Sequence, residues 1–183
     1  LIVTDVPSTA AGVFTKNRVV SPSVTWSRRA LEKSDRCRAI IVNSGNANAV
    51  VGPKGMKDCD AITKKISEEL SIPQKEVLIA STGVIGVPLP SDKILKAAPE
   101  LVKKLRRTAK NWIDAAEAIM TTDLVLKSDR IQYTFQGKRI SLGGITKGSG
   151  MIHPNMATML GFLYTDAVID SKTLKRALIE AAD

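Results

Sequence analysis

The stretch "RAIIVNSGNANA", residues 38–49, decides the fold class, because a short apolar β run ends there in a loop of Gly, Asn and Ser. Beyond the loop, apolar residues recur at helical spacing with Lys and Glu on the opposite face: Met56, Cys59, Ile62, Ile66 and Leu70. A second apolar run, "EVLIAST" at 76–82, follows this helix and leads into the loop "GVIGVPLP" at 83–90. A strand, a helix and a strand in succession indicate a mixed α/β protein.

Toward the N-terminus, "LIVTD" at 1–5 and "GVFTKNRVV" at 12–20 are typical of two strands, and we expect a turn through Pro7 and Ser8 to join them. The chain begins with Leu rather than Met, in a pattern that is already a strand. At the other end, "SKTLKRALIEAAD" at 171–183 stops within a helical pattern. We therefore expect the chain to be a piece of a longer protein.

The central region predicts further helices and then a hairpin. Asp92 is placed to cap a helix that ends at Ala97, and Pro99 suits the first turn of a second helix. Asn111 is placed to cap a third helix, "WIDAAEAIM". The segments "IQYTFQG" and "KRISLGG", which together span 131–144, predict a β-hairpin that turns through Gln136 and Gly137.

Composition excludes several classes of function. The chain has 183 residues, 44% of them apolar, so it is long enough to bury a core. No apolar run approaches the roughly 18 residues of a membrane span, so we expect a soluble protein without a membrane partner. The net charge is +9, but the basic residues are scattered beside acids and aromatic residues are only 4%. This distribution disfavours a nucleic-acid partner.

Cysteine and histidine offer little chemistry. Cys37 and Cys59 have no CxxC partner and no nearby histidine, so we expect buried thiols in a reducing cytosol and no metal site. The chain has one histidine, His153, which precedes a proline and completes no Ser-His-Asp or Cys-His arrangement. We expect His153 to be structural.

The segment "KGSGMIHPNMATML", residues 147–160, is the most unusual in the chain. It is not a phosphate-binding loop, because Gly148 follows Lys147 where that motif needs Ser or Thr. Its Thr158 stands between a Gly- and Pro-containing loop and an apolar β run. If the bond before Thr158 were cut, the new α-amine, with a pKa of about 7.7–8.0, would be the base that a threonine nucleophile needs. The alternative is a threonine that merely begins a strand.

Five blocks of the sequence resemble, in the same order, the ornithine acetyltransferase (glutamate N-acetyltransferase) family of arginine biosynthesis. They are "TAAGVFTKNRV", "IIVNSGNANA", "ASTGVIGVPLP", "AIMTTD" and "GGITKGSGMIHPNMATMLGFLYTDA". In that family a precursor cleaves itself before a threonine, and the matching bond here is Ala157–Thr158. The resemblance thus implies that residues 1–157 are the α chain without its first residues, and that 158–183 begin the β chain.

The resemblance also implies roles for individual residues. Thr158 matches the acetyl-carrying nucleophile, Thr82 and Gly83 match the oxyanion hole, and Lys147 and Thr121 match residues that hold the substrate. A glycine lets its backbone N–H approach the acyl oxygen, and a threonine hydroxyl adds a second donor. A lysine is a point charge suited to a carboxylate. The structural alternatives are a turn after a strand for "STG", a solvent-exposed lysine, and a helix C-cap at Thr121.

The implied function is transacetylation by a ping-pong mechanism. N-acetylornithine acetylates Thr158 and ornithine leaves, after which glutamate takes the acetyl group. The resemblance implies no cofactor, although some members also use acetyl-CoA as a donor. The implied fold is a layered αββα sandwich, similar to N-terminal nucleophile hydrolases in architecture but different in topology. The implied assembly has two α and two β chains, in the cytoplasm or, in a fungus, the mitochondrial matrix.

Other functions stay open from the sequence. One is a self-processing N-terminal-threonine hydrolase, an aminopeptidase or amidase in which water replaces glutamate. Another is a basic binding protein without chemistry. The family's second chain also continues far beyond residue 183 and supplies further substrate ligands, among them an acidic residue.

Overall fold

The computed structural model describes residues 1–150 and 159–182. Its first sheet contains three strands, β1 (Ile2–Thr9), β2 (Arg36–Asn43) and β3 (Val77–Ser81), in the order β1-β2-β3. Strand β1 runs antiparallel to β2, whereas β3 runs parallel to β2. The parallel pairing needs a long crossover, which is α2 (Lys54–Leu70), and the predicted strand–helix–strand order is confirmed.

Helices cover one face and one edge of the first sheet. The apolar side of α2 packs on β2 and β3 to form the main core, which contains Ile41, Ile62, Ile66 and Val77. Helix α1 (Pro22–Lys33) lies along the free edge of β3, where the Ser27 hydroxyl accepts from Ile79 N–H and donates to Ile79 O. These two bonds satisfy the backbone N–H and C=O of Ile79 on an edge that has no further strand beside it within the described ranges.

The second sheet is antiparallel, with β4 (Lys127–Phe135), β5 (Lys138–Lys147) and β6 (Leu160–Thr165) in that order. Strands β4 and β5 form the predicted hairpin. Its two turn residues, Gln136 and Gly137, have φ values of 47° and 75°. Two positive φ angles are the signature of a type I′ turn, which matches the twist of the strands.

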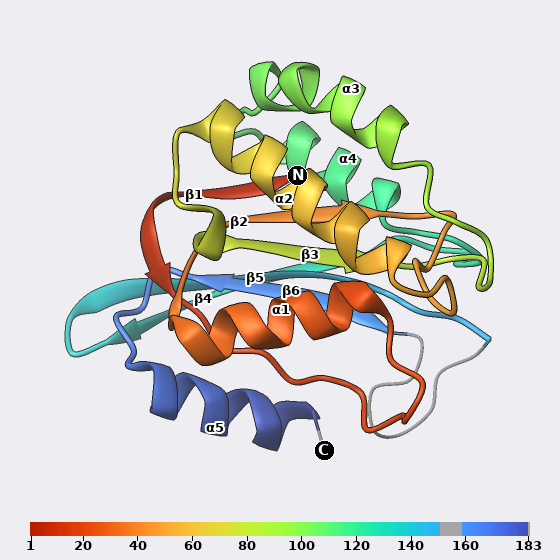
Figure 1. The fold of residues 1–183 in the computed structure, drawn as a ribbon. Helices are drawn as coiled ribbons and strands as arrows, with labels where there is room; N and C mark the ends of the chain where they lie inside the picture. The colour runs from red at the N-terminus through yellow and green to blue at the C-terminus, as the bar shows by residue number, and fades with distance from the viewer. Residues whose placement is uncertain (151–158, 183) are drawn as a thin grey trace.

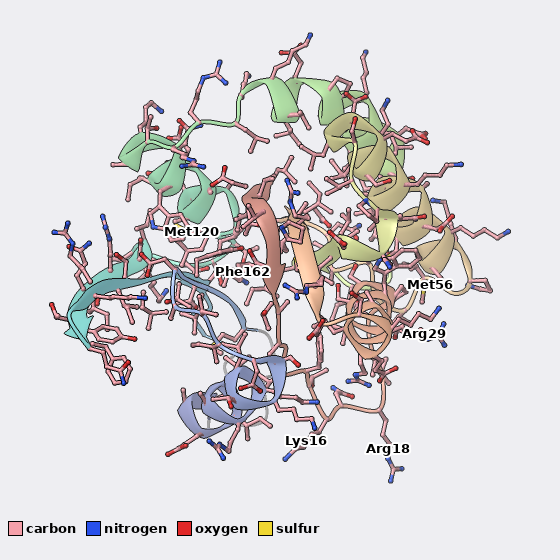
Figure 2. All side chains as sticks on the ribbon, turned by 90° about the vertical axis from the view of Figure 1, so that its left-hand side faces the viewer. Lys16, Arg18, Arg29, Met56, Met120 and Phe162 are labelled. Carbon is pink, nitrogen blue, oxygen red and sulfur yellow. The ribbon has the colours of Figure 1, made fainter. Side chains whose placement is uncertain are left out.

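A second core joins the two sheets. Ile145 of β5 and Phe162 of β6 pack with Ala116 and Ile119, contributed by α4 (Ala109–Ala118) and its end, and with Val42 of β2. Figure 2 labels Phe162, which lies on the side of the second sheet that approaches the first. In Figure 1 the sheets lie one above the other, with α2 and α3 (Ser91–Lys103) beyond the first and α5 (Ser171–Ala182) beyond the second. The expected layers of helix, sheet, sheet and helix are therefore confirmed. No helix within the described ranges is long and apolar enough to cross a membrane.

The strand expected over 1–5 is confirmed as part of β1, but the expected turn through Pro7 and Ser8 and the second strand are wrong. One strand, β1, passes through Pro7 and Ser8, and 12–20 contains no strand. Strand β1 is an edge strand whose pairing shifts between Val3 and Ser8, and proline is tolerated at such irregular edges. Between 12 and 20, side chains bond locally to the backbone instead. Asn17 N–H donates to Thr15 Oγ1, and Val19 N–H donates to Asn17 Oδ1.

Three predicted helix boundaries are also wrong. The N-cap of α3 is Pro90, so Asp92 lies in the first turn and is not the cap. A single helix, α3, runs from Ser91 to Lys103 with Pro99 inside it. Its apolar side chains on both sides of the proline pack against the main core, and this burial offsets the roughly 3 kcal/mol that an interior proline costs. Helix α4 is capped by Thr108, whose side chain accepts from Asn111 N–H, so Asn111 lies in the first turn and is not the cap.

Candidate active site

Two loops interlock where the parallel strands β2 and β3 end. The Thr82 N–H donates to Asn43 O at 3.1 Å, and Val84 N–H donates to Gly45 O at 3.2 Å. Ala47 N–H returns a bond to Val84 O at 2.9 Å. The carboxyl ends of parallel strands share one edge of a sheet, so both loops lie at the same end of the molecule.

Gly83 allows the two loops to approach this closely. Its φ is +134°, a conformation that side-chain-bearing residues rarely adopt. A Cβ at this position would lie 2.2 Å from the carbonyl carbon of Gly45 and 2.5 Å from Asn46 N. Sequence reasoning explained this glycine by contact with a substrate oxygen. The structure adds a nearer reason, which is backbone packed directly against the Gly83 Cα.

Lys147 links this turn to the second sheet. Lys147 is the last residue of β5 and only 3% exposed, and its Nζ donates to Thr82 Oγ1 at 3.0 Å and to Thr121 Oγ1 at 2.8 Å. Three of the residues selected from the sequence therefore meet in one hydrogen-bonded cluster. The alternative of a solvent-exposed Lys147 is wrong. The C-cap of α4 is Ile119, so Thr121 does not cap that helix, and its exposed position opens the cluster to solvent.

Asp123 supports both sides of this cluster, and sequence reasoning assigned it no role. Its side chain is 1% exposed, and its Oδ1 accepts from Gly148 N–H at 2.8 Å and from Lys127 Nζ at 2.7 Å. Its Oδ2 accepts from Thr121 N–H at 3.2 Å. Burial disfavours the charged carboxylate, but the bonds from Lys127, Gly148 and Thr121 outweigh it and hold the pKa of Asp123 well below its usual range. The signal was present in the sequence, as the last residue of "AIMTTD".

Several polar side chains form a hydrogen-bonded cluster next to the Thr82 turn. The Ser81 hydroxyl bonds to the Ser23 hydroxyl at 2.7 Å, and Asn48 Nδ2 donates to Gly55 O at 3.1 Å and to Cys59 Sγ at 3.3 Å. Asn48 is fully buried. These contacts tie β3, α1, α2 and the Asn48 loop together, so they hold the backbone from which Thr82 projects.

Both cysteines are buried and free, as predicted. Burial raises the pKa of Cys37 and of Cys59 to about 11, so both are neutral thiols near neutral pH and poor nucleophiles. Across the described ranges, no group of three or more His, Cys, Asp or Glu side chains is arranged to hold a metal ion.

Three predictions fall outside the described residues: the nucleophile Thr158, the cleavage site Ala157–Thr158, and the structural role of His153. The described chain resumes at Met159, and Leu160 pairs with Lys147 in the ladder between β5 and β6. The site that the structure describes thus consists of Thr82, Gly83, Thr121 and Lys147, together with Asp123.

A family model described as the ArgJ family matches residues 1–183. The arginine biosynthesis bifunctional protein ArgJ of Thermotoga neapolitana is 47% identical over 184 residues, which cover 100% of this chain and 46% of that protein. The protein of the same name from Caldanaerobacter subterraneus is 48% identical over 168 residues, which cover 91% of this chain and 41% of that protein. This chain therefore spans less than half the length of these curated relatives.

Solved structures share the fold. A crystal structure of the arginine biosynthesis bifunctional protein ArgJ from Bacillus halodurans has a TM-score of 0.78 at 38% identity, covering 85% of this chain and 80% of that chain. The crystal structure of ornithine acetyltransferase complexed with ornithine from Mycobacterium tuberculosis has a TM-score of 0.72 at 37% identity, covering 81% of this chain and 78% of that chain.

Proposed function

This chain belongs to the ArgJ family, and we propose that it is part of an arginine-biosynthesis enzyme that moves an acetyl group from N-acetylornithine to glutamate. The observation that carries the proposal is the hydrogen-bonded cluster of buried Thr82 and Lys147 with exposed Thr121, which brings two hydroxyls and a cation together where both sheets end. Acyl transfer needs such donors where negative charge develops on the acyl oxygen.

The nucleophile of the proposed reaction is Thr158. Its Oγ attacks the acetyl carbonyl carbon of N-acetylornithine, and its proton passes through its own α-amine to the departing nitrogen, so ornithine leaves as an amine. The amine of glutamate then attacks the acetyl ester, and the threonine oxygen recovers a proton. The Thr82 hydroxyl and the Gly83 N–H are the proposed donors to the oxyanion in both steps.

The amine of Thr158 must first be released. In the proposed processing step, Thr158 Oγ attacks the carbonyl of Ala157, an N-to-O acyl shift gives an ester, and water hydrolyses this ester. Residues 1–157 then belong to one chain and 158–183 begin the next. We propose that the two chains stay together, with two of each in the assembly, in the cytoplasm of the cell.

Substrate binding is the proposed role of Thr121 and of the third N–H of Lys147. Two of the three Nζ donors of Lys147 bind threonine hydroxyls, which leaves one for a carboxylate. N-acetylornithine and glutamate both carry an α-carboxylate, so one cation serves both half-reactions. The ornithine in the relative from Mycobacterium tuberculosis supports this substrate class. The proposal needs no cofactor, and acetyl-CoA would enter as a second acetyl donor to the same threonine.

The test uses the full-length enzyme that contains this chain, with N-acetylornithine in the presence and absence of glutamate. A transacetylase sustains ornithine release only with glutamate, and without it gives one equivalent of ornithine and an acetylated threonine. Sustained release without glutamate would instead identify the hydrolase. A protein that forms no acetyl adduct and releases no ornithine would contradict both enzymes.

A further inference from the structure

We propose that Lys147 is a positioning residue for the Thr82 hydroxyl: it aims and polarises this donor, and so assists the chemical step through Thr82 as well as binding the substrate. The inference rests on the proposed function, because it concerns the donor to the acyl oxygen. A lysine that only binds substrate affects the binding step. A lysine that positions Thr82 also affects the rate of acetyl transfer, and this effect requires the Thr82 hydroxyl.

The geometry sets the direction of the two hydrogen bonds. An ammonium group has three N–H donors and no acceptor, so Thr82 Oγ1 at 3.0 Å and Thr121 Oγ1 at 2.8 Å must both accept from Lys147. Each hydroxyl has a single proton. Neither proton can point toward Lys147, so each is directed to another partner.

The Thr82 hydroxyl proton is left for such a partner. Within the described ranges, the only hydrogen bond of Thr82 Oγ1 is the one it accepts from Lys147. Thr82 is only 7% exposed, so the residue as a whole is largely shielded from solvent. The adjacent Gly83 is held by the interlocked loops. Lys147 thus leaves a hydroxyl donor beside the Gly83 N–H, in the pair proposed to bind the oxyanion.

The charge of Lys147 is not neutralised by direct contact in the part of the chain that the structure describes. None of the ion pairs found there includes Lys147. The nearby Asp123 instead binds Lys127, Gly148 N–H and Thr121 N–H. A hydroxyl that accepts from a buried cation becomes a stronger donor, because hydrogen bonds in series polarise one another. This effect grows as negative charge develops on the acyl oxygen, so it favours the transition state over the bound substrate.

The two roles predict different kinetics. If Lys147 only binds a carboxylate, Lys147→Met raises KM for both substrates and its effect is the same whether or not residue 82 carries a hydroxyl. If Lys147 acts through Thr82, the variant also lowers kcat, and that loss depends on the hydroxyl. A double-mutant cycle separates these cases.

The cycle compares the wild type, Thr82→Ala, Lys147→Met and the double variant, each as full-length enzyme whose cleavage is checked by intact mass. Acetyl-enzyme formation from N-acetylornithine is followed in a single turnover, and kcat and KM are measured with glutamate. We expect Thr82→Ala to lower the rate by about 10²–10³. At saturating N-acetylornithine, Lys147→Met should lower the acetylation rate constant of the wild type by at least about tenfold, but that of Thr82→Ala by less than about twofold. Thr82→Ser should restore most of the dependence on Lys147.

Lys64→Met is the matched control, because Lys64 lies on the exposed side of α2 and undergoes the same chemical change. Lys64→Met should leave the acetylation rate unchanged both in the wild type and in Thr82→Ala. If Lys147→Met does not fold or cleave, Lys147→Gln replaces it in the cycle, since it keeps a donor and removes the charge. Multiplicative losses in kcat, or an effect on KM alone, would overturn the inference while leaving the transacetylase intact. A wild type without acetyl transfer would instead overturn the proposed function.

Discussion

Gly83→Ala tests the interlocked loops most directly. Two costs are expected. A side chain at φ +134° carries backbone strain of about 1–3 kcal/mol. The new Cβ would also overlap backbone of Gly45, 2.2 Å away, and such overpacking costs about 1–3 kcal/mol more. The sum of about 2–6 kcal/mol is a large part of the 5–15 kcal/mol that stabilises a typical domain.

The assay is urea unfolding of the full-length enzyme, with Gly86→Ala as the control. Gly86 also has a positive φ, +80°, but a Cβ there would have nothing within 4 Å, so this variant carries the strain without the overlap. We expect Gly83→Ala to be less stable than Gly86→Ala by at least about 1 kcal/mol, and to lose acetyl transfer because the turn that holds Thr82 shifts. Equal stability of the two variants, with activity retained in both, would refute the reasoning.

Three further predictions concern processing, pH and the thiols. Thr158→Ala should stay uncut at Ala157–Thr158, whereas Thr158→Ser should still be cut. Intact mass and N-terminal sequencing of the fragments would show this. Cleavage of Thr158→Ala at the same bond would contradict the mechanism. Asp123→Asn should lower the urea midpoint near neutral pH, because the folded-state pKa of Asp123 lies below the unfolded value of about 3.9. The contribution of this carboxylate is complete above that value and is lost as the pH falls further, so the difference from wild type should shrink below about pH 4. Cys37 and Cys59, with pKa values of about 11, should resist alkylation at pH 8 in the native protein and react after unfolding in urea. Mass spectrometry would measure the extent of alkylation. Rapid alkylation of the native protein would contradict the burial of the two thiols.

Local signals in the sequence were sufficient to predict a helix or a turn where no contact with a distant segment overrides them. The apolar face of 56–70 and the Gln136–Gly137 turn predicted α2 and the β4–β5 hairpin, because helical spacing and positive φ are properties of the segment itself. The predictions failed where packing overrides a local rule. Pro99 does not end α3, because apolar residues on both sides of it are held in the core.

The candidate site divides in the same way. Sequence blocks that resemble a family were enough to select Thr82, Gly83, Thr121 and Lys147, since motifs record residue types and their order. They do not record which of these residues touch. Lys147 and Thr82 are 65 positions apart. Lys147 ends β5 of the second sheet and Thr82 follows β3 of the first, so only the stacking of those sheets brings their side chains to 3.0 Å. Asp123 looks like an ordinary acid after a helix until the fold places Gly148 N–H and Lys127 beside it. The sequence thus determined which groups are present, whereas tertiary packing decided which are buried together, because burial and hydrogen bonding depend on segments far apart in the chain.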